Sequence, residues 1–166
     1  ETWGIPLRPI DKTYGPRVLI LGDAAGFAKP TTGGGIYYAM ISGQLAAETI
    51  LYCMRIGNFN SKELSRYQSR WEKSFGDELK TGYNARLLYE CLDDKALNKL
   101  LEKFSSIEIQ KEILSSEEFS FDWHASIIGS TVRNKEIYSI LTSLGPGIPA
   151  FFAKVLKRLF LESAYR

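Results

Sequence analysis

The stretch that decides the fold is residues 17–48, RVLILGDAAGFAKPTTGGGIYYAMISGQLAAE. It opens with Val-Leu-Ile-Leu at 18–21, a continuous apolar run bounded by turn residues. Such a run predicts a strand over 17–21 in a parallel sheet covered on both faces. A loop over 22–34 follows, and from Gly35 to about Ile56 the apolar residues recur at helical spacing. The stretch therefore predicts a buried strand, a glycine-rich loop and a helix in unbroken succession.

The helix predicted over 35–56 has one apolar face and ends at Gly57, which is a typical C-terminal stop. Small residues on the helix favour close packing against a sheet. The predicted core face consists of Ile36, Ala39, Met40, Gly43, Ala46, Ala47, Ile50 and Met54. The small residues are Ala39, Ser42, Gly43, Ala46 and Ala47.

Outside this stretch the chain reads as mostly helical. Pro6 and Pro9 predict an extended segment over 4–10, and Tyr14-Gly15-Pro16 predicts a turn. Asn60 and Glu63 predict a capping pair at the start of a long helix, for which residue 92 is the furthest predicted end. Its apolar face consists of Leu64, Tyr67, Trp71, Phe75 and Leu79. Further helices are predicted over 94–104, 107–114, 136–144 and 149–164, and 119–123 is ambiguous between loop and strand.

One isolated buried strand cannot make a stable sheet. Leu19 and Leu21 need partner strands that this chain barely supplies, so either another polypeptide completes the sheet or the fragment rearranges to bury that surface. The chain begins at Glu1 and continues with Trp3-Gly4-Ile5-Pro6, a sequence typical of the interior of a longer protein. We therefore expect a piece of a longer protein, mostly α as an isolated chain, with one or two short strands followed by a helical region.

Composition excludes several classes of function. The hydrophobic fraction of 45% and charged fraction of 24% are those of an ordinary globular protein, and a net charge of +2 does not indicate a nucleic-acid binder. His124 is the one histidine in the sequence, which disfavours a histidine-based metal site and a Ser-His-Asp triad. We therefore predict no bound metal. No apolar run is long enough to span a membrane. Cys53 and Cys91 are predicted to be two reduced, buried thiols, a single disulfide being the alternative.

The loop between strand and helix carries the candidate chemistry. Asp23 follows the carboxyl end of the strand, where ligands bind in open α/β sheets, and its carboxylate can accept hydrogen bonds from sugar hydroxyls. The glycines at 33–35 let a backbone approach a bulky ligand and present N–H groups at a helix N-terminus. Pro30 stiffens the loop, and Thr31 and Thr32 offer N-cap hydroxyls. Taken singly, Asp23 is better explained by an ordinary turn, and the three glycines by a flexible loop without a ligand.

Taken together, GDAAGFAKPTTGGGIYYAMISGQLAAE at 22–48 resembles the second FAD-binding motif of glutathione-reductase-type flavoproteins of the p-hydroxybenzoate-hydroxylase superfamily. Within that group it is most similar to the geranylgeranyl reductase family, including archaeal digeranylgeranylglycerophospholipid reductases. The sequence PLRP at 6–9, and Tyr67, Trp71 and FGDEL at 75–79, also resemble this family. The likeness extends over about residues 1–100. It implies an α/β flavoprotein with a Rossmann domain, of which this chain would be the C-terminal portion.

The resemblance implies which residues contact FAD. Asp23 would contact ribityl or ribose hydroxyls near the pyrophosphate, and Pro30 would lie beside the isoalloxazine. Gly33, Gly34, Gly35 and Ile36 would bring backbone N–H groups and a helix dipole towards the flavin N1/O2 side. A reduced flavin is negatively charged there, and a helix N-terminus stabilises an anion by roughly 0.3–2 kcal/mol. Residues 1–57 would be the end of the FAD-binding domain, and residues 58–166 a helical C-terminal region.

The family's GxGxxG motif, which holds the ADP half of FAD, does not occur in this sequence. We therefore expect a missing Rossmann half or a partner chain, and weak or absent FAD binding by this chain alone. The whole protein would be an oxidoreductase of lipid biosynthesis that transfers hydride from reduced flavin to isoprenoid double bonds. The alternative is a non-catalytic helical interaction module, or a subunit that completes a flavin site in trans.

The catalytic residues, the lipid substrate's identity, the electron donor and the oligomeric state stay open at this point. The helix predicted over 149–164 is amphipathic and carries Lys154, Lys157 and Arg158 on its polar side. It indicates either a peripheral contact of a cytoplasmic protein with a membrane surface, where a prenyl lipid would reside, or docking onto the rest of the protein.

Overall fold

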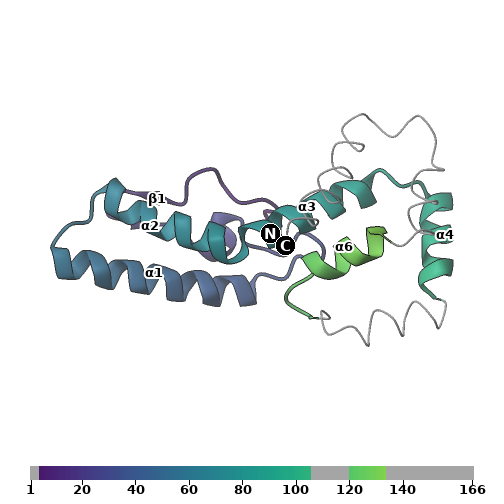
Figure 1. Ribbon diagram of the computed structural model, residues 1–166. Helices are drawn as coiled ribbons and strands as arrows, with labels where there is room; N and C mark the ends of the chain where they lie inside the picture. The colour runs from purple at the N-terminus through teal and green to yellow at the C-terminus, as the bar shows by residue number, and fades with distance from the viewer. Residues whose placement is uncertain (1–3, 106–119, 134–166) are drawn as a thin grey trace. The chain divides into compact units, whose positions relative to one another are not determined.

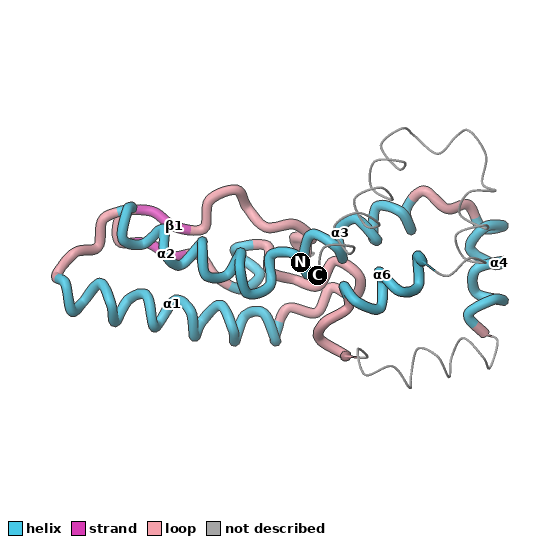
Figure 2. The backbone as a smooth tube through the Cα atoms, in the orientation of Figure 1, coloured by secondary structure: helices cyan, strands magenta, loops and turns pink. Residues whose placement is uncertain are grey.

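The computed structural model of the chain describes residues 4–105 and 120–133 (Figures 1 and 2). The chain divides into two compact units, residues 1–83 and 84–166. The first unit holds a short two-stranded sheet and a pair of long helices. The described part is mostly helical, as the sequence predicts, and the domain boundary after residue 57 stays a prediction.

The strand predicted over 17–21 is shorter than expected and has a different partner. β1 (Tyr14–Gly15) and β2 (Val18–Leu19) form an antiparallel ribbon in which Tyr14 faces Leu19. The chain reverses at Pro16 and Arg17, where Arg17 has φ 62° and its N–H donates to the carbonyl of Phe59 at 3.1 Å. The prediction of a parallel strand covered on both faces is wrong for this chain, because no parallel neighbour lies among the described residues and Val18 is half exposed.

A compact turn connects β2 to the long helix. The 3-10 helix η1 (Gly22–Ala25) follows β2 and ends at Gly26, which has φ 76°. The predicted extended segment over 4–10 runs beside this turn, since the N–H of Ile10 donates to the carbonyl of Ala25 at 3.1 Å. A side chain on Gly26 would overlap the carbonyl oxygen of Arg8, so glycine is required there by both its φ angle and its neighbour.

Helices α1 (Ile36–Ile56) and α2 (Ser61–Trp71) pack side by side and form a helical hairpin (Figure 1). Gly57, in the left-handed conformation, ends α1 as predicted. The Asn60 side chain accepts a hydrogen bond from the N–H of Glu63 at 2.9 Å, which confirms the predicted cap. An ion pair between Arg70 and Glu48 joins the two helices near the surface.

The core of this unit is built on the face of α2 that the sequence predicts. Leu64, Tyr67, Trp71, Phe75 and Leu79 are all buried. A π-helical turn, η2 (Glu72–Gly76), continues α2 into α3 (Asp77–Glu90) and keeps the last of these residues on the buried side. The aromatic rings of Phe27 and Tyr38 join this cluster. The ring centroids lie 4.7 Å apart for Phe27 and Trp71, 5.1 Å for Phe27 and Phe75, and 5.2 Å for Tyr38 and Phe75.

The face that α1 buries is not the predicted one. Its buried residues are Tyr38, Ser42, Ala46, Thr49 and Cys53, which we call the inner face. Of the predicted core face, Ile36, Met40, Ile50 and Met54 are exposed. Burial of the two hydroxyl residues is possible because each bonds within the helix, Ser42 to the carbonyl of Ala39 at 3.0 Å and Thr49 to that of Leu45 at 2.8 Å.

In the second unit the structure describes α4 (Asp94–Phe104) and α6 (Ala125–Arg133). α4 confirms the helix predicted over 94–104, and the carboxylate of Asp93 accepts a hydrogen bond from the N–H of Ala96 at its start. α6 was not predicted. The helices predicted over 107–114, 136–144 and 149–164 lie outside the described residues. Both cysteines are free; Cys53 is buried as predicted, but Cys91 is exposed, which corrects that prediction.

Replacing Gly26 with alanine is expected to lower the free energy of unfolding by about 3 kcal/mol, because the new side chain is strained at positive φ and displaces the Arg8 carbonyl. Gly43→Ala is the matched control. Gly43 is helical and a side chain there meets open space, so this variant should gain about 0.5–1 kcal/mol. Urea denaturation of both variants checks this, and equal effects of the two substitutions would contradict it.

Burial raises the pKa of the Tyr67 phenol to about 12, while its hydroxyl donates to the carbonyl of Ile20 at 3.1 Å. The neutral phenol is therefore favoured in the folded state. This preference contributes about 3 kcal/mol to the free energy of unfolding, which corresponds to two pKa units. The contribution is complete below pH 10 and is lost as the pH rises from 10 through 12.

Urea denaturation at pH 8 and pH 11.5 tests this. The stability difference between the parent chain and Tyr67→Phe should shrink or reverse at the higher pH. An unchanged difference would show that the Tyr67 phenol does not set this pH dependence.

Candidate functional site at the N-terminus of helix α1

Asp23 and Gly35, two of the predicted site residues, meet in the structure. Asp23 lies in the first turn of η1 and is exposed, and Gly35 is the N-cap residue of α1. A Cβ atom on Gly35 would overlap the carboxylate of Asp23. The carboxylate is therefore held against the backbone at the point where α1 begins. Eleven residues, 24–34, lie between Asp23 and Gly35, so the loop that they form must close on itself.

The loop closes through its own backbone. The N–H of Lys29 donates to the carbonyl of Gly34 at 2.9 Å, and the N–H of Gly33 donates to the carbonyl of Lys29 at 2.7 Å. Gly33 has φ 76°, a conformation that favours glycine. Gly34 is exposed, and Ile36, the first residue of α1, is 81% exposed. Gly33, Gly34, Gly35 and Ile36 thus form one open rim beside Asp23.

Ser42 supports this rim, although the sequence indicated only a packing role for it. Its hydroxyl oxygen accepts a hydrogen bond from the N–H of Gly22 at 3.2 Å and is fully buried. Gly22 has φ 57°, and a side chain on it would come within 3.2 Å of the Cβ of Ala39. The residue before Asp23 is therefore fixed to α1 both by a hydrogen bond and by close contact. The sequence signal for this role was a serine two turns into a helix that begins with glycines.

Pro30 is buried rather than presented on the rim. A side chain on Gly82 of α3 would come within 3.2 Å of the Cδ atom of Pro30, so the missing side chain at Gly82 makes room for the proline. This contact anchors the tip of the loop to α3, while Thr31 and Thr32 remain exposed. Contact between Pro30 and an isoalloxazine ring stays a prediction.

The arrangement offers two chemical functions at one place. The first N–H groups of a helix have no partner within that helix, and the helix dipole favours negative charge there. The Asp23 carboxylate beside them accepts hydrogen bonds from hydroxyl groups. A ligand that combines hydroxyls with an electron-rich, anion-forming ring therefore fits the chemistry of these residues. The missing side chain of Gly35 is what lets the Asp23 carboxylate lie against the start of α1.

His124 lies in the second unit, and a ring nitrogen is 3.0 Å from the carbonyl oxygen of Phe121. Among the residues that the structure describes, no group of three His, Cys, Asp or Glu side chains could hold a metal ion. No helix within the described ranges is long and apolar enough to cross a membrane.

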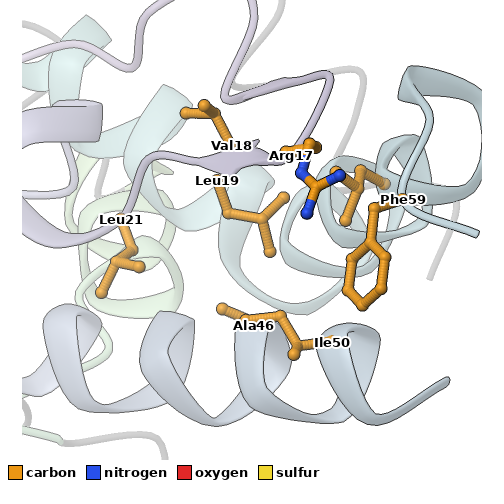
Figure 3. Close-up of a pocket in the computed structure, with 8 residues that line it drawn as sticks. Arg17, Val18, Leu19, Leu21, Ala46, Ile50 and Phe59 are labelled. Carbon is orange, nitrogen blue, oxygen red and sulfur yellow. The ribbon is translucent and has the colours of Figure 1, made fainter. Parts of the chain in front are cut away.

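A separate hollow of about 340 Å³ lies between β2 and α1 (Figure 3). In this view Leu19 points towards Ala46 and Ile50 of α1, and Leu21 points down onto the same helix. Ala46 is ten residues into α1, roughly 15 Å along the helix from Ile36, so the hollow is distinct from the rim at Asp23. Its full lining is Arg17, Val18, Leu19, Leu21, Ala46, Ile50, Phe59 and Leu64.

No family model matches the chain. Among curated proteins it is 37% identical over 112 residues to digeranylgeranylglycerophospholipid reductase 1 of Methanopyrus kandleri, a match that covers 67% of this chain and 29% of that protein. It is 36% identical over 115 residues to the digeranylgeranylglycerophospholipid reductase of Methanosphaerula palustris, covering 64% of this chain and 29% of that protein.

A solved structure of a geranylgeranyl bacteriochlorophyll reductase-like protein from Thermoplasma acidophilum is similar with a TM-score of 0.62 and 21% identity. The similarity covers 84% of this chain and 33% of that one, and it shows the fold. The matches span less than a third of the length of the curated relatives. On these similarities, the chain belongs to the geranylgeranyl reductase family and corresponds to a part of its members' length.

Proposed function

We propose that this chain supplies the second FAD-contacting segment of a flavin-dependent reductase that saturates isoprenoid double bonds of lipids. The observation that carries the proposal is the meeting of the Asp23 carboxylate with Gly35 at the N-terminus of α1. Relatives named digeranylgeranylglycerophospholipid reductase support the substrate class, since their name describes a lipid with geranylgeranyl chains.

In this proposal Asp23 binds and orients the cofactor. Its exposed carboxylate accepts hydrogen bonds from ribityl or ribose hydroxyls. The hydrogen bond that the N–H of Gly22 donates to Ser42 holds the residue before it in position. The backbone of Gly33, Gly34, Gly35 and Ile36 lies against the flavin, where the positive end of the α1 dipole favours the negative charge of the reduced ring. Gly35 has no side chain that would separate the ring from the carboxylate.

Bound FAD, once reduced, supplies a hydride to one carbon of the double bond, and a proton is added to the other. We assign no residue of this chain as the proton donor. The chain's contribution is to position the cofactor and to favour its reduced form. The other cofactor contacts would come from a Rossmann half, present in the same polypeptide or in a partner chain.

The proposal includes a cytoplasmic location with a peripheral membrane contact through residues 149–164, which lie outside the described residues. The competing function is a helical interaction module without catalysis. Its supporting observation is the exposed apolar surface of α1, and the experiment below separates the two.

The test uses a chimera in which this chain replaces its matching segment in the Methanopyrus kandleri reductase. We expect a yellow protein with FAD released on denaturation. Asp23→Ala should weaken FAD binding about 10- to 100-fold, the equivalent of losing a hydrogen bond to a charged group at about 1.5–3 kcal/mol. Gly35→Val should abolish it by pushing the Asp23 carboxylate out of its place against the start of α1. Fluorescence titration with FAD measures both.

The matched control is Ser69→Glu on the exposed side of α2, which should leave FAD affinity unchanged. A chimera that folds but stays colourless with added FAD would support the interaction module. Unchanged FAD affinity in both Asp23→Ala and Gly35→Val would overturn the proposed cofactor contacts.

A further inference from the structure

Tyr67 and Trp71 lie one turn apart on α2, and each brings a polar group into the core. Tyr67 is fully buried and Trp71 is 5% exposed. The Tyr67 hydroxyl donates a hydrogen bond to the carbonyl of Ile20 at 3.1 Å, just beyond β2. The indole N–H of Trp71 donates to the hydroxyl of Thr13 at 2.8 Å, just before β1. Helix α2, which lies beside the ribbon in Figure 1, is therefore bonded to both of its strands through side chains.

Backbone hydrogen bonds connect these two contacts. The N–H of Ile20 donates to the carbonyl of Thr13 at 2.8 Å, so both backbone polar groups of Ile20 are bonded. The N–H of Thr13 donates to the side-chain carbonyl of Gln68 on α2 at 3.1 Å. Thr13 is fully buried, and the loss of one of these bonds would leave a polar group without a partner away from water. The bonds therefore hold the ribbon in one place on α2.

The end of the ribbon leads directly to the candidate site. Ile20 lies three residues before Asp23, and one extended residue separates it from Gly22. In such a segment the carbonyl of Ile20 and the N–H of Gly22 point to the same side. Tyr67 bonds to the first of these groups, and Ser42 accepts a hydrogen bond from the second at 3.2 Å. Two buried hydroxyl groups, one from each long helix, thus hold the chain immediately before Asp23.

The two hydroxyl groups also interact with each other. Burial raises the pKa of the Tyr67 phenol to about 12, and a hydrogen bond with the Ser42 side chain acts against that rise. Ser42 belongs to α1, whose N-cap residue is Gly35. The position of Asp23 relative to Gly35 is therefore set from both helices at once.

We propose that Tyr67 and Trp71 are positioning residues for the carboxylate of Asp23. They act through the backbone of Ile20 and the side chain of Thr13, and neither touches the cofactor. Helix α2 fixes the point at which the chain leaves the ribbon, and with it the place of the carboxylate against the start of α1. This inference rests on the proposed function for the ligand of Asp23, whereas the placement of Asp23 is measurable without a ligand.

Packing alone does not require these polar groups. Phenylalanine would fill nearly the same space as Tyr67, and valine nearly the same space as Thr13, without burying a hydroxyl that needs a partner. Hydrogen bonds are directional and fix one register, whereas apolar contacts tolerate repacking. The buried polar groups of α2 therefore favour a role in placement over a role in packing.

Amide hydrogen exchange of the full chain tests the placement without FAD. Tyr67→Phe removes the hydroxyl and keeps the ring, and Thr13→Val removes the acceptor of Trp71 in a side chain of similar size. In both variants the Gly22 amide should exchange about 10-fold faster relative to the Ala46 amide, in the middle of α1, than it does in the parent chain.

Thr49→Val is the matched control. Thr49 is buried on the same face of α1 as Ser42, but its hydroxyl bonds to the carbonyl of Leu45 within the helix. This variant should leave the ratio of the Gly22 and Ala46 exchange rates unchanged. An unchanged ratio in Tyr67→Phe and Thr13→Val as well would show only a general loss of stability, and it would overturn the inference.

FAD titration of the Methanopyrus kandleri chimera tests the link to the cofactor. Tyr67→Phe and Thr13→Val should each weaken FAD binding about 3- to 10-fold, and Thr49→Val less than about 2-fold. In an Asp23→Ala background the effect of Tyr67→Phe should disappear, because a positioning residue acts through the carboxylate that has been removed.

An undiminished effect of Tyr67→Phe in the Asp23→Ala background would overturn the inference, since Tyr67 would then act independently of that carboxylate. A chimera that stays colourless would contradict the proposed function, and the exchange ratio in the full chain would still decide whether Tyr67 and Trp71 place Asp23. A changed exchange ratio would then uphold the placement, and an unchanged one would refute it.

Discussion

The structure of the first unit depends on the closure of the segment from Gly22 to Gly35. The chain must leave β2, turn back, and arrive at the N-terminus of α1 close to where it started. Three glycines with positive φ, Gly22, Gly26 and Gly33, permit these reversals. Close packing leaves no room for alternatives, because a side chain on Gly26 or Gly35 would overlap Arg8 or Asp23.

This closure links the core to the candidate site. Phe27, inside the closed segment, packs against Trp71 and Phe75 of the α2–η2 helix, so the apolar core fixes the middle of the loop. Ser42 fixes its first residue, and Gly82 makes room for Pro30 near its tip. The rim at Asp23 is thus positioned by residues that would not touch a ligand, which is the arrangement a rigid cofactor site needs.

The two faces of α1 have different roles. The inner face stabilises the unit by packing against α2 and the aromatic cluster, and it accommodates two hydroxyl residues whose bonds stay within the helix. The opposite side of α1, with Ile36, Met40, Leu51 and Met54, is more apolar and largely exposed. A helix with this distribution is unremarkable in a larger α/β protein, where one side faces a sheet and the other a helical layer.

Local signals in the sequence were sufficient for α1, α2 and α4 and their ends, but not for α6. The Asn60 cap, the Gly57 stop and the buried face of α2 depend on neighbouring residues, so they can be predicted without a tertiary structure. The glycine motif also predicted that Asp23 and Gly35 lie together, which the structure confirms, and the family resemblance predicted a flavin as their ligand. The predicted core face of α1 was wrong for this chain, because hydropathy shows which side is most apolar and not which side a given partner covers.

The sequence by itself determined the order of elements, the glycine positions and the family. Only the tertiary structure decided that β2 pairs with β1 in an antiparallel ribbon, that Ser42 and Gly82 hold the loop, and which side of α1 is buried. The physical reason is that strand pairing and helix burial are set by contacts between residues far apart in the chain, and a strand or helix that lacks its partner adopts the best contacts that remain.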